Sequence, residues 1–273
     1  MILLHLTAAA LYALAAWVLW PSAAPALDGT AHTTPRPIRA ATWLLPSALL
    51  LHAWLAWQDI VTPEGLDLSL VNALSAVAGL VAAVAWLSGL LAQLPAIGTV
   101  VLPVAAAASL LPAFITNPHR FAYAGDAIAA AHVAVALVSY AMFLVAALEA
   151  LVLMGLEKRL HRRLPDPDSA ALPPLLTLER FLFRLVAVGF TLLTLTLASG
   201  MLFTEQLFGK PLTFTHKSVF SVLGWLTFGA LLWGRWRYGW RGRVALRWII
   251  AGTVFVFLAY LGSKFVLEVL LGR

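Results

Sequence analysis

The chain has 273 residues, of which 62% are hydrophobic and 11% charged, with a formal net charge of +6 and no cysteine. Soluble domains average about 45–50% apolar and about 25% charged residues, so this composition predicts a membrane protein. The absence of cysteine excludes disulfides, thiolate metal sites and CxxC redox chemistry in this chain. In a membrane protein the basic excess is explained by topology, and we expect no nucleic-acid partner.

Hydropathy predicts an all-α, polytopic membrane protein with about eight transmembrane helices in a single domain over residues 1–273. Each expected span is close to the roughly 20 residues that cross about 30 Å of hydrocarbon. The spans cover residues 3–20, 40–57, 68–91, 97–115, 127–154, 181–203, 218–233 and 244–263. The connection LAQLPAIG between the third and fourth spans has no charge, so one re-entrant hairpin is the alternative there.

The lysines and arginines predict the orientation, because basic residues are enriched in cytoplasmic loops. With both termini outside, 13 basic residues fall on the inner side and 5 on the outer side. We therefore expect an N-out, C-out protein of the inner (plasma) membrane. The segment APALDG at residues 24–29 resembles a signal-peptide cleavage site, but no basic segment precedes it, so we expect the first helix to be retained.

Two histidines are predicted at the same depth in the membrane. His52 lies about five residues from the outer end of the second span, and His132 lies about five residues into the fifth. At 1.5 Å per residue both lie about 8 Å below the outer boundary. One interpretation makes them axial ligands of a haem iron, with one ligand from each helix. The alternative is that each neutral ring forms a hydrogen bond to a neighbouring helix.

Other polar residues favour structural roles. Glu149 is expected to pair with Arg180 or Arg184 at the inner end. The run WGRWRYGWRGR at 233–243 is typical of an aromatic, basic inner belt in contact with anionic lipid. The sequence contains no motif typical of nucleotide binding, of metalloproteases or of serine hydrolases. This absence argues against an enzyme but does not decide the question.

Five segments together resemble the cytochrome c assembly family of CcsA-like haem-handling proteins, and in particular its shorter YpjD-type branch. They are HVAVALVSYAMFLVAALEAL, LERFLFRLVAVGFTLLTLTLASG, HKSVFSVLGWLTFGALLWGR, AYLGSKFVLE and GLDLSLVNALS. The resemblance covers about residues 40–271. It implies that His132, followed by a Ser-Tyr pair, matches the first outer haem-ligand histidine of the family.

The chain departs from this family at three landmarks. The tryptophan-rich haem platform is replaced by LFTEQLFGKPLTFTHKS, in which His216 stands where the family has an aspartate. The membrane histidine of the family aligns with Trp233, and its second outer histidine aligns with Gly262–Lys264. The missing platform argues against haem-lyase activity, whereas haem binding requires only that His52 or His216 supply the second ligand.

The resemblance favours a protein that binds or handles haem at the outer (periplasmic) face, with an apocytochrome or another membrane assembly factor as partner. Three basic residues expected at this face are candidates for contact with the haem propionates: Arg120, Lys217 and Lys264. The alternative function is a transporter, or an accessory subunit of a membrane complex, without haem. Glu149 would then be its functional residue.

Overall fold

The computed structural model describes residues 1–19, 38–63, 65–92, 98–115, 120–121, 127–161, 175–202, 216–266 and 270. The part of the chain that it describes is almost entirely helical. Its eight helices of 16 residues or more are α1 (Ile2–Leu19), α2 (Ile38–Ile60), α3 (Leu70–Ala92), α4 (Gly98–Phe114), α5 (Ala127–His161), α6 (Leu175–Leu202), α8 (His216–Tyr238) and α9 (Gly242–Phe257). Each of the eight expected spans overlaps one of these helices.

Five of the helical segments are long and apolar enough to cross a membrane. They are Leu70–Leu90, Ile128–Gly155, Leu176–Leu202, His216–Tyr238 and Gly242–Phe265. Two shorter apolar helices, Ile2–Val18 and Gly98–Phe114, accompany them in the described residues. Apolar helices fit the hydrocarbon because all their backbone hydrogen bonds are made within the segment.

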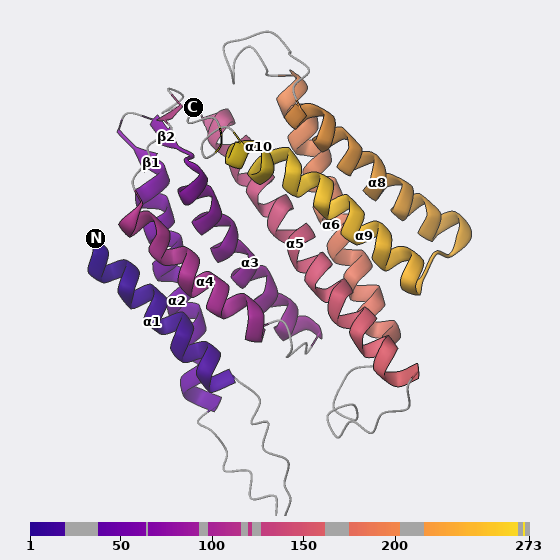
Figure 1. Cartoon of the computed structure of the whole chain (residues 1–273), viewed down its shortest axis with the longest axis horizontal. Coiled ribbons are helices and arrows are strands. Elements are labelled where there is room, and N and C mark those ends of the chain that lie inside the picture. The colour runs from indigo at the N-terminus through magenta and orange to yellow at the C-terminus, as the bar shows by residue number, and fades with distance from the viewer. Residues whose placement is uncertain are drawn as a thin grey trace, which may run out of the picture.

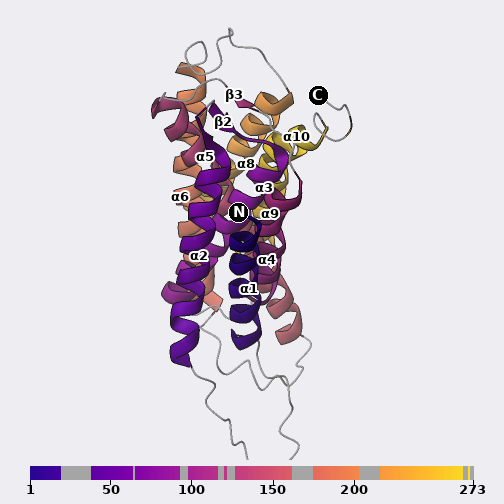
Figure 2. The same ribbon diagram turned by 90° about the vertical axis from the view of Figure 1, so that its left-hand side faces the viewer.

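The helices form two groups that meet along α3 and α5. In Figure 1, α1 to α4 lie on the left and α5, α6, α8 and α9 on the right; Figure 2 shows the first group from its own side. Within the first group α1 packs against α2 and α4, and within the second group α5 packs against α6 and α9. Contacts between α3 and α5 join the two groups.

Close helix approach in the second group depends on two glycines. The rings of Phe143 and Phe228 stack at 3.8 Å with an interplanar angle of 8°. A Cβ at Gly189 would lie 3.0 Å from the Phe143 ring, and one at Gly252 would lie 2.8 Å from the Phe228 ring. The stacked pair therefore fits only because both facing positions lack a side chain, as small residues allow in membrane helix packing.

A small antiparallel sheet, which the sequence did not predict, accompanies the predicted helices. Its strands are β1 (Val61–Thr62), β2 (Gly65–Asp67) and β3 (Arg120–Phe121), in the order β1-β2-β3. Gly65, the first residue of β2, has a φ of 143°, which few other residues adopt. The sheet joins the connection after α2 to the connection after α4. We call this end of the bundle, where α5 and α8 also begin, the sheet end (Figure 1).

Candidate functional site

A buried polar cluster lies among the first three helices. The phenol oxygen of Tyr12 lies 3.2 Å from Nδ1 of His52, and the Ser75 hydroxyl lies 2.9 Å from its Nε2. All three side chains are almost fully buried. A Cβ at Gly79 would lie 3.0 Å from Nδ1, so the imidazole lies directly against the backbone of α3. Both ring nitrogens of His52 are thus used in hydrogen bonds inside the first helix group.

A second polar cluster lies two turns nearer the sheet end on the same helices. His5 and Tyr12 are seven residues apart on α1, as are His52 and Asp59 on α2, which places each pair on one helix face. Nδ1 of His5 lies 2.7 Å from the Ser109 carbonyl oxygen, and its Nε2 lies 3.6 Å from the Asp59 carboxylate. The first helix group therefore contains two polar clusters at successive levels of the same helices.

His132 belongs to a different set of contacts in the second helix group. Its Nδ1 lies 2.8 Å from the Ser199 hydroxyl on α6, and its ring faces Gly200, where a Cβ would lie 3.4 Å from Cε1. The side chain is half-buried near the start of α5. The ammonium group of Lys217 on α8 is close enough to act on the charge of this imidazole.

Lys217 and a second lysine both approach the ring of one tyrosine, Tyr260. Nζ of Lys217 lies 5.3 Å from the centre of the Tyr260 ring, and Nζ of Lys264 lies 5.8 Å from it. Lys264 also donates a hydrogen bond to the carbonyl oxygen of Leu68, just before α3. Tyr260 lies in the π-helix η2 (Leu258–Gly262), and Lys264 lies in the short α10 (Ser263–Phe265) that follows it. Such π-helical turns are rare and frequently occur at functional sites.

We call this set the sheet-end cluster; it comprises His132, Ser199, Lys217, Tyr260 and Lys264. It combines an oriented imidazole with two ammonium groups, so it offers a metal ligand together with partners for carboxylates. These donors fit the two recognisable parts of haem, its iron and its propionates. The lysines and His132 were predicted from the sequence, whereas the roles of Ser199 and Tyr260 were not.

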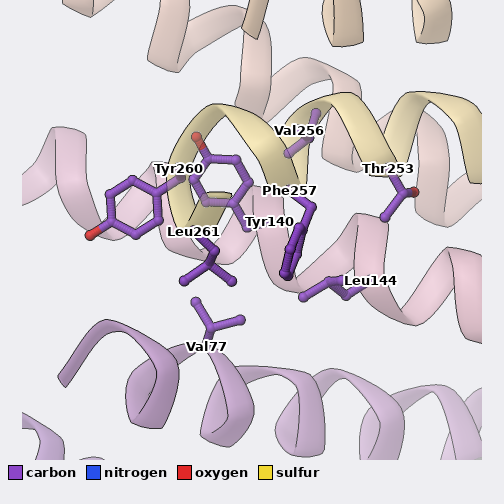
Figure 3. A pocket seen from close by; sticks show the side chains of 8 residues that line it. All are labelled: Val77, Tyr140, Leu144, Thr253, Val256, Phe257, Tyr260 and Leu261. Atoms are coloured by element: carbon purple, nitrogen blue, oxygen red, sulfur yellow. The ribbon is translucent and has the colours of Figure 1, made fainter. Parts of the chain in front are cut away.

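A small cavity lies beside the sheet-end cluster. Figure 3 shows it between α3, α5 and the α9–η2 segment, with Val77 and Leu261 directed toward one another across it. Its volume is about 10 Å³, which is the space of about one water molecule. The Tyr140 ring on its wall stacks on Tyr260 at 5.5 Å. A macrocycle does not fit inside this part of the bundle, so a ligand of that size would bind at the surface of the sheet end.

The three predicted haem ligands lie on three different helices, α2, α5 and α8. His52 makes its hydrogen bonds to α1 and α3, His132 makes one to α6, and His216 is exposed at the first residue of α8. Among the described residues no group of three histidine or acidic side chains converges on a metal position. A shared iron between His52 and His132 stays a prediction. Several positions lie outside the described residues: His32, His119, the phenylalanines at 203, 208 and 214, and residues 165–174 of the proline-rich linker.

At the end of the bundle opposite to the sheet end, the charged side chains do not form the expected pairing. Arg235 on α8 lies 2.9 Å from the carboxylate of Glu179 on α6, a pair that sequence spacing alone does not reveal. Glu149 is buried, and its Oε1 has no hydrogen-bond partner within the described residues. Arg180 and Arg184 are exposed on α6. The expected pairing of Glu149 with either arginine is therefore not formed in the part of the chain that is described.

Comparison with known proteins gives a family match over most of the chain. A family model described as "Cytochrome C assembly protein" matches residues 42–271. The inner membrane protein YpjD of Escherichia coli K12 is 36% identical over 139 residues, which are 51% of this chain and 52% of that protein. The cytochrome c biogenesis protein CcsA of Gloeobacter violaceus is 30% identical over 92 residues, 34% of this chain and 27% of that protein. The chain thus spans about half the length, or less, of these curated relatives, and no solved structure matches it.

Proposed function

Because the chain belongs to the cytochrome c assembly protein family, we propose that this inner-membrane protein handles haem at the sheet end of its bundle. The single observation that carries the proposal is the sheet-end cluster. In this cluster the charge of Lys217 acts on His132, the residue that matches a family haem ligand. Lys217 and Lys264 both lie close to the ring of Tyr260.

Each part of the cluster has a separate task in this proposal. His132 provides an imidazole nitrogen for the iron, while the Ser199 hydroxyl at 2.8 Å from Nδ1 fixes the orientation of the ring. Lys217 and Lys264 bind the propionate carboxylates, because an ammonium group pairs with a carboxylate as a charge-assisted hydrogen bond. Bound haem supplies the iron and its redox chemistry, and the chain supplies ligation and orientation.

Two histidines, His216 and His52, are candidates for the second axial ligand. His216 is exposed and adjacent in sequence to Lys217, so ligation there breaks no described hydrogen bond. Ligation by His52 requires the ring to exchange hydrogen bonds with Tyr12 and Ser75 for the metal, at a cost of about 1 kcal/mol for each bond. We therefore favour His216, with His52 as the alternative.

Orientation in the membrane belongs to the same proposal. Eight crossings with both termini outside place the sheet end at the outer (periplasmic) face, where an apocytochrome or another assembly factor would meet the haem. The strong excess of basic residues at the opposite side supports this arrangement.

An absorption spectrum of the protein in mild detergent, after haem supplementation, tests the proposal. We expect a Soret band that shifts or is lost in His132→Ala, with haem affinity reduced about tenfold or more. His161→Ala changes the histidine at the far end of the same helix and is the matched control. His216→Ala should resemble His132→Ala, and His52→Ala should not. A native protein without haem-dependent absorbance, or a His132→Ala variant with an unchanged spectrum, would contradict the proposal.

A further inference from the structure

The connection between α8 and α9 forms a rigid, exposed surface at the end of α8 that is opposite to Lys217. Trp240 packs against Gly234, where a Cβ would lie 2.4 Å from its indole, and against Trp248 at 5.3 Å. Arg235 donates hydrogen bonds to Glu179 and to the Trp240 carbonyl oxygen at 2.9 and 3.1 Å. These contacts fix the turn to α6 and α9.

Arginines on this turn carry charge that acidic residues do not neutralise. Arg235 pairs with Glu179, and Arg243 lies 3.5 Å from Glu157. In the described residues the other three arginines of the turn and of the first turns of α9 have no acidic partner, and all three are exposed: Arg237, Arg241 and Arg247. The turn and the adjacent ends of α8 and α9 therefore present three guanidinium groups that have no acidic partner among the described residues.

Exposed aromatic side chains lie on the last turns of α8, and the guanidinium carbon of Arg237 lies 5.6 Å from the centre of the Tyr238 ring. Trp233, Trp236 and Tyr238 are 59%, 75% and 67% exposed. Trp and Tyr with this exposure are typical of the boundary between hydrocarbon and lipid headgroups. We call the three arginines and three aromatic residues together the arginine–tryptophan surface.

An apolar stripe on α8 leads from the hydrocarbon to this surface. Its members recur at helical spacing and are exposed on one face of the helix: Val219, Val222, Leu223, Leu226 and Trp233. A small soluble anion would make no contact with this stripe, whereas an acyl chain of a lipid can pack along it. The stripe and the arginines together indicate a ligand with a long apolar part and an anionic head.

We infer that the arginine–tryptophan surface binds an anionic phospholipid, with its phosphodiester on the arginines and an acyl chain along α8. Guanidinium groups bind phosphate oxygens through paired N–H donors, which lysine does not reproduce in geometry. This site is at the opposite end of the bundle from the sheet-end cluster and does not depend on haem.

The test uses the full chain in mild detergent and counts bound lipid by native mass spectrometry. Phosphatidylglycerol is the probe, and phosphatidylcholine with the same acyl chains is the comparison. We expect tighter binding of phosphatidylglycerol, weakened by salt. The combined variant Arg237→Gln, Arg241→Gln and Arg247→Gln should lose about 100-fold in affinity, since each basic residue near an anionic surface contributes about 1 kcal/mol.

Controls separate charge, position and folding. Arg180→Gln with Arg184→Gln removes two exposed arginines from α6, a helix without tryptophan or tyrosine, and should leave the affinity unchanged. Substitution of the three surface arginines by lysine keeps the charge but removes the paired donors, so its loss of affinity should be measurable and smaller than that of the glutamine variant. The Soret band of haem-loaded protein should be the same in all variants, which keeps this test independent of the haem proposal.

Three results would overturn the inference. The first is equal affinity of the native protein for the two lipids, which needs no variant and so is not affected by misfolding. The second is unchanged phosphatidylglycerol binding in the glutamine variant. The third is displacement of the lipid by inorganic phosphate at equal concentration, which would indicate a site for a small anion.

Discussion

At the scale of single residues, the close contact between Gly79 and His52 gives a prediction about stability. The imidazole is held by two hydrogen bonds, so it cannot move away from a Cβ that would lie 3.0 Å from Nδ1. We expect Gly79→Ala to lower the free energy of unfolding by about 1–3 kcal/mol, the usual cost of overpacking. Reversible unfolding by SDS in mixed micelles measures the change.

Two comparison variants identify the cause of that loss. A Cβ at Gly155 on α5 meets no atom within 4 Å, so Gly155→Ala should be neutral or stabilising by up to about 1 kcal/mol. Tyr12→Phe removes one hydrogen bond to the same ring, and such bonds in membranes contribute about 0.6 kcal/mol on average. A larger loss for Tyr12→Phe than for Gly79→Ala would contradict the steric explanation.

A common depth of His52 and His132 can be predicted from the sequence and stays a prediction, whereas their hydrogen-bond partners could not be identified from it. Depth follows from counting residues along a span, because the rise per residue is constant. The direction of a side chain depends on the rotation of its helix about its axis and on which helix lies next to it. The local sequence reveals neither of these. Thus Ser75 and Gly79 lie one turn apart on α3, and only the fold shows that the His52 ring lies against both of them.

At the scale of elements, the helices were predicted well because each apolar run is long and bounded by polar or proline-containing segments. The missed element is the three-stranded sheet, whose strands contain only two or three residues each. Segments this short have no detectable alternation of polar and apolar residues. Pairing of β2 with β3 joins residues more than 50 positions apart, which no local pattern predicts.

Contact between α8 and α9 gives a prediction for a pair of elements. A Cβ at Gly252 would lie 2.8 Å from the Phe228 ring, which is itself stacked on Phe143 and cannot turn aside. We expect Gly252→Ala to lower the thermal midpoint of the protein in detergent through a loss of about 1–3 kcal/mol. Gly229→Ala on α8 is the control, because its Cβ would make an ordinary 3.5 Å contact with Phe190. Equal midpoints for the two variants would show that α8 and α9 separate without cost.

At the scale of the whole molecule, the polar groups are divided between the two helix groups. The first group contains two polar clusters, one around His5 and one around His52, and their contacts join α1, α2, α3 and α4. The second group has its two largest sets of basic side chains at its two ends, in the sheet-end cluster and in the arginine–tryptophan surface. This division agrees with a scaffold that binds ligands at its membrane boundaries, where charged side chains cost less than at the bilayer centre.

The orientation of the whole molecule can be tested directly because the chain contains no cysteine. A single introduced cysteine is then the only thiol that a membrane-impermeant maleimide can label in intact spheroplasts. Val61→Cys and Ile115→Cys lie at exposed positions at the sheet end and should be labelled from outside. Tyr238→Cys, exposed at the opposite end, should be labelled only after permeabilisation.

Leu90→Cys decides between two crossings and a re-entrant hairpin for α3 and α4. Leu90 is 64% exposed and lies near the end of α3 that is remote from the sheet. If α3 crosses the bilayer, the thiol reaches the inner boundary and is labelled after permeabilisation, as Tyr238→Cys is. A re-entrant hairpin would keep it in the hydrocarbon, where maleimide does not label it from either side, because a thiol there is neither hydrated nor ionised. Labelling of Leu90→Cys in intact spheroplasts would contradict both arrangements and the N-out, C-out topology with them.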